Sequence, residues 1–191
     1  MRRLDLVPIC WTGGSALVER LSAGLERELL VEVRRRQVWF DPELSFDSSR
    51  GQYRSTALLR MLLDDPLGND GGWVLGLAGV DLFAPVLTYV FGEAQLGGRA
   101  AVVSGHRLRP EAYGLPADDD VLLERLLKES LHELGHVLGL IHCPAPDCVM
   151  HPSTYAEDID SKPAEFCTPC LRHVRKRVGG APRSGPAARR A

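Results

Sequence analysis

Apolar residues recur at helical spacing in three stretches of this chain, and each stretch predicts a helix with one buried face. The first, over 15–29, is marked by leucines four residues apart: Leu17, Leu21, Leu25 and Leu29. The second runs over 55–63 and ends at the polar run 64–66. The third starts at the acids 118–120, which suit the positive end of a helix dipole, and stops near Gly139. Its buried stripe is expected to be Leu123, Leu127, Leu131, Leu134 and Leu138.

Runs of β-forming residues bounded by turn residues predict a set of strands. The predicted strands cover 4–9, 73–80, 86–91 and 100–104, and 31–40 is a further strand or hairpin followed by a polar loop over 41–52. Gly13 and Gly14 predict a turn and not a phosphate loop, because the fuller glycine pattern and its lysine are missing. The order of elements predicts an α+β fold, a mixed sheet with helices packed on it, in which 100–104 is an edge strand.

The C-terminal part of the chain is expected to be irregular. Four prolines, at positions 144, 146, 152 and 163, predict mostly loop over 140–166, and a short helix is predicted over 168–178. Residues 179–191 are rich in Gly, Pro, Ala and Arg and predict a basic, flexible tail. A length of 191 residues suits one domain, 1–178, with an upper part (1–139) and a lower part (140–178).

The composition is that of an ordinary globular protein. With 45% hydrophobic and 25% charged residues, it excludes the disordered, collagen-like and coiled-coil classes. The net charge of -2 hides an asymmetry, because seven Lys or Arg and no acid lie from Arg172 onward, which leaves an acidic main body. No apolar run reaches the roughly 18 residues of a membrane span, and 1–10 lacks the apolar stretch of a signal peptide. A cytoplasmic protein without disulfides is therefore expected.

The five cysteines are distributed unevenly. Cys10 stands alone and is expected to be a buried thiol. The other four lie within 28 residues, and the last two form a C-x-x-C: Cys143, Cys148, Cys167 and Cys170. In a reducing compartment such a cluster favours a four-thiolate zinc site. A redox motif or chance spacing stays open for a single C-x-x-C.

Residues 132–142 read HELGHVLGLIH. His132 and His136 are four residues apart on the predicted long helix, so both imidazoles project from one face and suit a zinc ion. Gly135 leaves the near wall of that face free of a side chain. A bare pair of this kind also occurs by chance in helices, so the interpretation depends on the rest of the run.

The rest of the run completes a catalytic zinc site. Gly139 lets the chain leave the helix at low cost, so that His142 can turn back as the third ligand and no glutamate from a later helix is needed. Three histidines leave one position open to a water molecule, whose pKa zinc lowers to about 7. Glu133, beside the histidine face, would take the proton of this water and pass it to the leaving amine. The predicted reaction is hydrolysis of an amide bond by a zinc-activated water.

Met150 follows His142 by eight residues. A methionine turn beneath a three-histidine zinc site marks the metzincin clan. Here the thioether would form an apolar floor without binding the metal, and a plain core methionine is the alternative. His151 is expected on a solvent-exposed loop and His173 in a solvated basic segment. Tyr155 could reach the substrate oxygen, although its spacing from Met150 is not that of the metzincins that use such a tyrosine.

The run from His132 to Cys170 resembles the archaemetzincins, also called archaelysins. In this chain the shared pattern reads HELGHVLGLIHCPAPDCVM, then 16 residues, then CTPC. Upstream, DLFAPVLTYVFGEAQLGGRAAVVS is similar, more weakly, to the strand region of that family. The resemblance implies a metzincin-like fold: an upper part of twisted sheet and helices, the two-histidine helix below it, and a lower part with the Met-turn. The edge near 98–104 would then hold an extended peptide by strand addition.

The resemblance also implies two Zn²⁺ ions and a role for each candidate residue. The ligands of the catalytic zinc would be His132, His136 and His142, with Glu133 as general base. The ligands of a second, structural zinc would be Cys143, Cys148, Cys167 and Cys170. A zinc at the cysteines would tie the loop that carries the third histidine to a C-terminal segment with little core of its own.

The leading hypothesis is therefore a cytoplasmic zinc metallopeptidase, active on peptide or protein substrates. The alternative is a metal-binding, peptide-recognition protein with little or no turnover, against which the intact Glu133 argues. A third class, a zinc-stabilised nucleic-acid adaptor, would use the cysteines and the basic tail but leaves the three histidines without a role. Neither a membrane nor a nucleic acid is expected as a partner, and a monomer is favoured.

Overall fold

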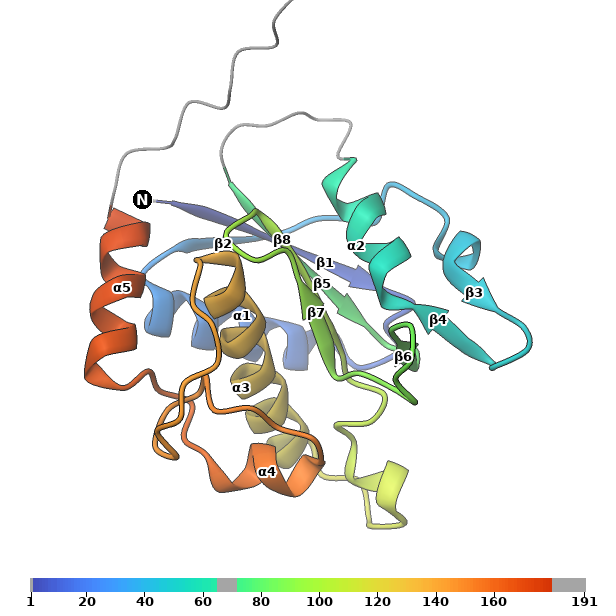
Figure 1. The fold of residues 1–191 in the computed structure, drawn as a ribbon. Coiled ribbons are helices and arrows are strands. Elements are labelled where there is room, and N and C mark those ends of the chain that lie inside the picture. Colours follow the sequence, from blue (N-terminus) through green and yellow to red (C-terminus); the bar gives the residue numbers. More distant parts are fainter. Residues whose placement is uncertain (1, 65–71, 180–191) are drawn as a thin grey trace, which may run out of the picture.

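The computed structural model describes residues 2–64 and 72–179. The predicted loop at 68–72 and the predicted tail at 179–191 lie almost entirely outside these residues. A five-stranded sheet forms the centre of the molecule, in the order β2-β1-β5-β8-β7 (Figure 1). Its strands are β1 (Arg3–Ile9), β2 (Glu32–Arg35), β5 (Trp73–Ala78), β7 (Gly92–Ala94) and β8 (Ala100–Ser104). All neighbours are parallel except β7, which pairs antiparallel with β8.

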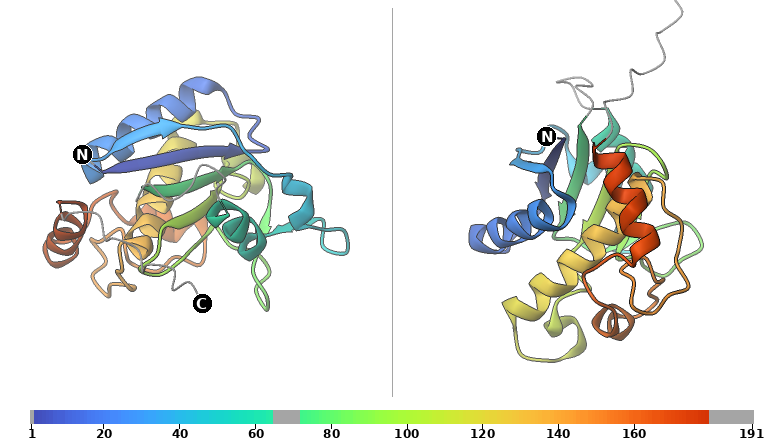
Figure 2. Two further views of the ribbon diagram at one scale, coloured as in Figure 1. Left: turned by 90° about the horizontal axis from the view of Figure 1, so that it is seen from above. Right: turned by 90° about the vertical axis from the view of Figure 1, so that its left-hand side faces the viewer.

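Helices cover both faces of this sheet (Figure 2). Helices α1 (Ser15–Leu29) and α3 (Asp119–Val137) pack on one face, and α2 (Ser55–Leu63) packs on the other. Alternation along the strands explains the two cores, because successive side chains point to opposite faces. In β5, Leu75 and Leu77 belong to the core under α1 and α3, whereas Val74 and Ala78 belong to the core under α2. The predicted α+β class, a mixed sheet with helices, is confirmed.

Helix α3 carries His132, Glu133 and His136 of the HELGHVLGLIH run. Asp118 caps its N-terminus by accepting from the backbone N–H groups of Asp120 and Val121. The predicted leucine stripe is correct for Leu131, Leu134 and Leu138, which are buried. Leu123 and Leu127 are half-buried, however, because the fully buried positions in the first half of the helix are Leu122 and Leu126. The helix therefore turns a wider apolar face to the core than one stripe provides.

Two of the strand predictions are wrong. The segment 100–104 is not an edge strand, since β8 lies between β5 and β7, and the edge is the three-residue strand β7. The segment 86–91 is not a strand either, because the chain turns there and Val86 takes a φ of +66°. Two short elements replace it: β6 (Leu82–Phe83) and β7. Strands of two or three residues are too short to show the alternation on which prediction depends.

The polar loop predicted over 41–52 holds more structure than expected. It contains a short 3₁₀ turn (Pro42–Ser45) and β3 (Phe46–Asp47), and it leads into β4 (Gln52–Arg54). These strands form a small second sheet, in the order β3-β4-β6. Cys10, expected to be buried, is exposed just after β1 at a φ of 48°. Strand β1 ends at Ile9, which is buried, and the chain leaves the core at the next residue, so the thiol of Cys10 faces solvent.

The lower part of the molecule follows α3 and is mostly loop, as the prolines predict. It contains two helices, α4 (Ala156–Ser161) and α5 (Thr168–Gly179), and the six-residue α4 was not predicted. A second 3₁₀ turn, Pro110–Tyr113, precedes α3. Within 2–64 and 72–179, none of the helices is both long and apolar enough to span a membrane.

Candidate active site

A cleft of about 600 Å³ lies between the edge of the central sheet and the lower part of the molecule. Its upper wall is the segment 87–92, which leads into the edge strand β7. Helix α3 forms the floor, and the loop 152–155 forms the lower wall. The residues of the HELGHVLGLIH run that face this cleft are His132, Glu133, His136 and His142.

The three histidines of the motif meet in this cleft. His132 and His136 lie on α3, His142 lies after the turn that ends the helix, and the ring centroids are 4.7 to 5.2 Å apart. The Nδ1–H of His132 donates to the carbonyl of Val149 at 2.9 Å, and the Nδ1–H of His136 donates to the carbonyl of Leu140 at 2.8 Å. Because a carbonyl only accepts, both Nδ1 atoms carry the proton and both Nε2 atoms offer a lone pair.

This geometry fits a bound metal ion. The Nε2 atoms of His132 and His136 are 3.1 Å apart, and nitrogen ligands of a tetrahedral zinc would be about 3.3 Å apart. Two lone pairs at this distance repel each other unless a cation lies between them. The ligand atoms of all three histidines lie within 4.8 Å of one another. Burial, with the nearby charge of Lys162, lowers the pKa of His132 to about 3, so this ring is neutral, as a zinc ligand must be.

Glu133 lies on the same floor and is buried. Burial raises the pKa of its carboxyl well above the usual range, and the carboxylates of Glu129 and Glu93 add to this effect, whereas Lys162 opposes it. The edge strand passes directly over the side chain. A Cβ built on Gly92 would lie 2.6 Å from Cγ and 2.9 Å from Oε1 of Glu133. The absence of a side chain at position 92 is therefore what makes room for this carboxylate.

A methyl group at position 92 is expected to displace Glu133 from its place under the sheet edge. In Gly92→Ala we expect kcat to fall by about 10²-fold, because a misplacement of about 1 Å has that cost, with little change in KM. Overpacking should also lower the melting temperature. Kinetics and thermal unfolding of the zinc-loaded variant check both effects.

A double-mutant cycle identifies the cause of the Gly92→Ala effect. In a Glu133→Ala background the same methyl group meets no carboxylate, so it should lower the melting temperature no further. Gly14→Ala is the matched control, because a Cβ at Gly14 meets nothing within 4 Å. Equal destabilisation by Gly92→Ala in both backgrounds would show that Glu133 is not the group that is displaced.

Two buried ionisable side chains at the site were not found from the sequence. Lys162 is 2% exposed, and its Nζ donates to the carbonyl of His151 at 2.9 Å and lies 3.5 Å from Nδ1 of His132. Glu129 is 5% exposed and lines the cleft one helical turn before Glu133. The spacing on α3 could have indicated Glu129, because residues three and four apart share a helix face. Lys162 lies 30 residues after the first histidine and carries no such signal.

Met150 is fully buried next to Gly135. A Cβ on Gly135 would collide with its Sδ and lie 3.4 Å from Phe166. Gly135 is therefore free of a side chain, as expected, and the side chain of Met150 occupies the space next to it. His151 differs from expectation. It is half-buried and donates from Nδ1 to the carbonyl of Cys143 at 3.2 Å, because the turn around Met150 folds back on the loop after the third histidine.

Two tyrosines lie at the mouth of the cleft. Tyr155 lines the lower wall with 62% of its surface exposed. The hydroxyl of Tyr89, on the upper wall, donates to the carbonyl of Thr154 at 3.1 Å. This bond links the sheet side of the cleft to the lower part of the molecule.

The four clustered cysteines also converge. Their sulfur atoms lie within 4.8 Å of one another, and all four are free thiols. The Sγ atoms of Cys143 and Cys167 are 3.8 Å apart, far beyond the S–S distance of a disulfide, which is about 2.05 Å. Sulfur ligands of a tetrahedral zinc, at about 2.3 Å each, would be about 3.8 Å apart. The donor set and its spacing fit a four-thiolate metal site.

Comparison with known proteins identifies the family of this chain. The family model described as peptidase family M54 matches residues 43–176. A protein named archaemetzincin from Methanocaldococcus jannaschii is 48% identical over 136 residues, which cover 71% of this chain and 73% of that protein. The resemblance predicted from the run between His132 and Cys170 is confirmed.

Solved structures show the same likeness. The crystal structure of an archaemetzincin from Methanopyrus kandleri matches with a TM-score of 0.81 and 37% identity, covering 94% of this chain and 96% of that one. The crystal structure of a zinc-dependent peptidase from Methanocorpusculum labreanum matches with a TM-score of 0.79 and 29% identity, covering 90% and 99%. The expected metzincin-like arrangement of sheet, helix and lower part is thus confirmed at the level of the fold.

Proposed function

Because this chain belongs to peptidase family M54, the archaemetzincin family of zinc metallopeptidases, we propose that it hydrolyses peptide bonds with a catalytic zinc held by three histidines and Glu133 as general base. The observation that supports this most strongly is the pair of Nε2 atoms 3.1 Å apart, each left with a free lone pair by a bond from its own Nδ1 to a carbonyl. Two lone pairs directed at one point from this spacing are what two ligands of a single metal ion require.

Each residue has a separable task in this mechanism. Zinc, when bound, supplies a Lewis acid that acidifies water and polarises the scissile carbonyl. His132, His136 and His142 would hold the ion, the first two through Nε2, because the carbonyls of Val149 and Leu140 keep these two rings in the required tautomer.

Proton transfer is the task of Glu133. Its carboxylate takes one proton from the attacking water and delivers it to the nitrogen of the leaving amine. Burial under the edge strand keeps bulk water away from this carboxylate, so the proton it holds is not lost to solvent before it reaches the amine.

We also propose a second, structural zinc at the four cysteines. Four thiolates leave no position open for water, which is the mark of a structural site. Met150 would act as the Met-turn, an apolar floor whose size is matched to Gly135. Both features fix the lower wall of the cleft relative to α3.

The cytoplasm is the proposed location, because the cysteines of the described residues are all free thiols and such clusters persist in a reducing compartment. Residues 1–178 would form one catalytic domain, since the two apolar cores lie on the two faces of a single sheet. The family implies a peptide or protein as substrate.

Cleavage of a diverse peptide mixture by the zinc-loaded protein tests the proposal, with mass spectrometry as readout and Glu133→Ala as control. New termini that appear only with the intact protein would establish turnover and show the preferred side chains. If zinc is bound but the two samples give the same termini, turnover is excluded for those peptides, and the peptide-recognition alternative gains support.

A further inference from the structure

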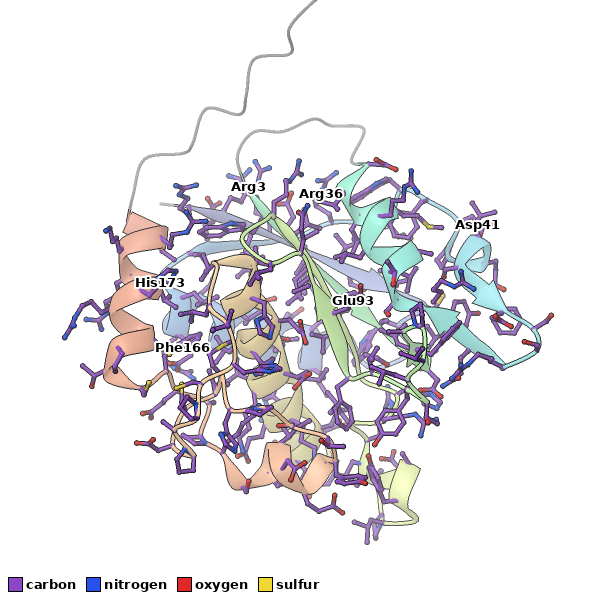
Figure 3. The ribbon with its side chains drawn as sticks, in the orientation of Figure 1. Arg3, Arg36, Asp41, Glu93, Phe166 and His173 are labelled. Carbon is purple, nitrogen blue, oxygen red and sulfur yellow. The ribbon has the colours of Figure 1, made fainter. Side chains whose placement is uncertain are left out.

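Helix α5 contacts the end of α3 through one carbonyl group. The carbonyl of Leu138, at the last turn of α3, accepts from Nε2 of His173 at 3.0 Å and from Nε of Arg177 at 3.0 Å. The two donors are four residues apart and therefore share one face of α5. Figure 3 labels His173 on this helix. We call His173 and Arg177 the basic clamp.

The basic clamp completes the hydrogen bonding of the helix end. The last carbonyls of a helix have no partner within it. In α3, the carbonyl of Gly135 accepts from the N–H of Leu140, and that of His136 accepts from the N–H groups of Gly139 and Gly97. Among the residues that the structure describes, the donors to the carbonyl of Leu138 lie on α5, and basic side chains suit the negative end of a helix dipole.

The segment that starts at this carbonyl positions two of the three histidines. Gly139 turns the chain with a φ of +96°. The next carbonyl, that of Leu140, accepts from Nδ1 of His136, and two residues later comes His142 itself. A shift of Leu138 would therefore move both the group that orients one metal ligand and the backbone that carries another.

Helix α5 packs on the main core through one apolar side. Its buried residues are Cys170 and Val174, the half-buried Leu171 and Val178 pack against the same core, and its first turn belongs to the four-cysteine site. Within the described residues, the bonds of the basic clamp are the side-chain hydrogen bonds that join α5 to the end of α3.

We propose that His173 and Arg177 are positioning residues, which hold the C-terminal turn of α3 so that His136 and His142 stay directed at the catalytic metal. The inference rests on the proposed three-histidine zinc site. His173 is exposed, as the sequence predicts, and Arg177 is half-buried. The inference gives this surface segment a role in metal retention.

The test is the rate at which an excess of a chromogenic chelator removes zinc from the zinc-loaded full-length protein. His142→Ala identifies the release phase of the three-histidine site. Arg177→Met and His173→Phe remove one donor each with similar bulk, and Arg177→Lys keeps a cation that can reach the same carbonyl. Arg175→Met is the matched control, because Arg175 is exposed on the same helix.

We expect Arg177→Met and His173→Phe to release the histidine-held ion about tenfold faster, since outer contacts of metal ligands typically contribute 10–100-fold in affinity. The cysteine-held phase should not change, kcat should fall more than KM changes, and Arg177→Lys should restore most of the retention.

Two results would overturn the clamp. One is a release rate in Arg177→Met equal to that in Arg175→Met. The other is an equal acceleration of both phases with a lower melting temperature, which would show general destabilisation in place of positioning. If the wild-type protein has no phase that depends on His142, the proposed active site itself is wrong, and the clamp falls with it.

Discussion

Replacing Glu133 by glutamine is expected to lower kcat/KM by about 10²–10⁴-fold, the usual contribution of a general base. Glutamine keeps the size of the side chain and so fits the same space under Gly92. It accepts and donates hydrogen bonds but cannot take a proton at neutral pH. The three histidines are untouched, so zinc content and melting temperature should stay at the wild-type values.

The measurement is steady-state hydrolysis of a peptide that the wild-type protein cleaves, with zinc content determined on the same samples. Glu111→Gln is a suitable control, because Glu111 is exposed in the 3₁₀ turn that precedes the same helix. It removes the same charge without touching the cleft and should leave kcat/KM within about twofold, as surface changes usually do. Full activity in Glu133→Gln with zinc in place would remove Glu133 from the mechanism.

Replacing Cys167 by serine is expected to give the largest loss of stability. The structural site would lose one of four thiolates, and apparent binding energies of structural zinc are about 10–16 kcal/mol in small zinc modules. The loop over 140–166 has little regular structure besides α4, so it has little else to fix it. We expect zinc content to fall from two ions to one and the melting temperature to drop by at least about 5 °C.

Differential scanning calorimetry and zinc analysis check this result. Cys10→Ser is the matched control, since Cys10 is an exposed free thiol outside the cluster. It should change neither quantity. Unchanged zinc content together with an unchanged melting temperature in Cys167→Ser would contradict a structural metal at the cysteines.

The site was predictable from sequence to an unusual degree because its ligands are local. His132 and His136 share one helix face by spacing alone, and Gly139 marks the turn that brings His142 back. Helices α1 and α2 were equally clear, since a continuous apolar stripe and a turn signal bounded each of them. In these stretches the residues that form each feature lie within about fifteen residues of one another along the chain.

Features that depend on distant segments could not be predicted. The edge of the sheet was misplaced, because strand order reflects pairing between segments and β7 is only three residues long. Lys162 reaches the site from a loop, and His173 reaches Leu138 from a separate helix. Neither position has a local pattern that distinguishes it from a solvated basic residue.

The order of residues along the chain also sets when the active site can exist. All three histidines and all four clustered cysteines lie between 132 and 170, after every strand of the central sheet. Chains emerge from the ribosome N-terminus first, and their N-terminal parts fold first. The scaffold is therefore synthesised before any metal ligand, and a nascent chain that ends before His142 cannot assemble the three-histidine site. Proteolytic competence, on this account, arises only near the end of translation.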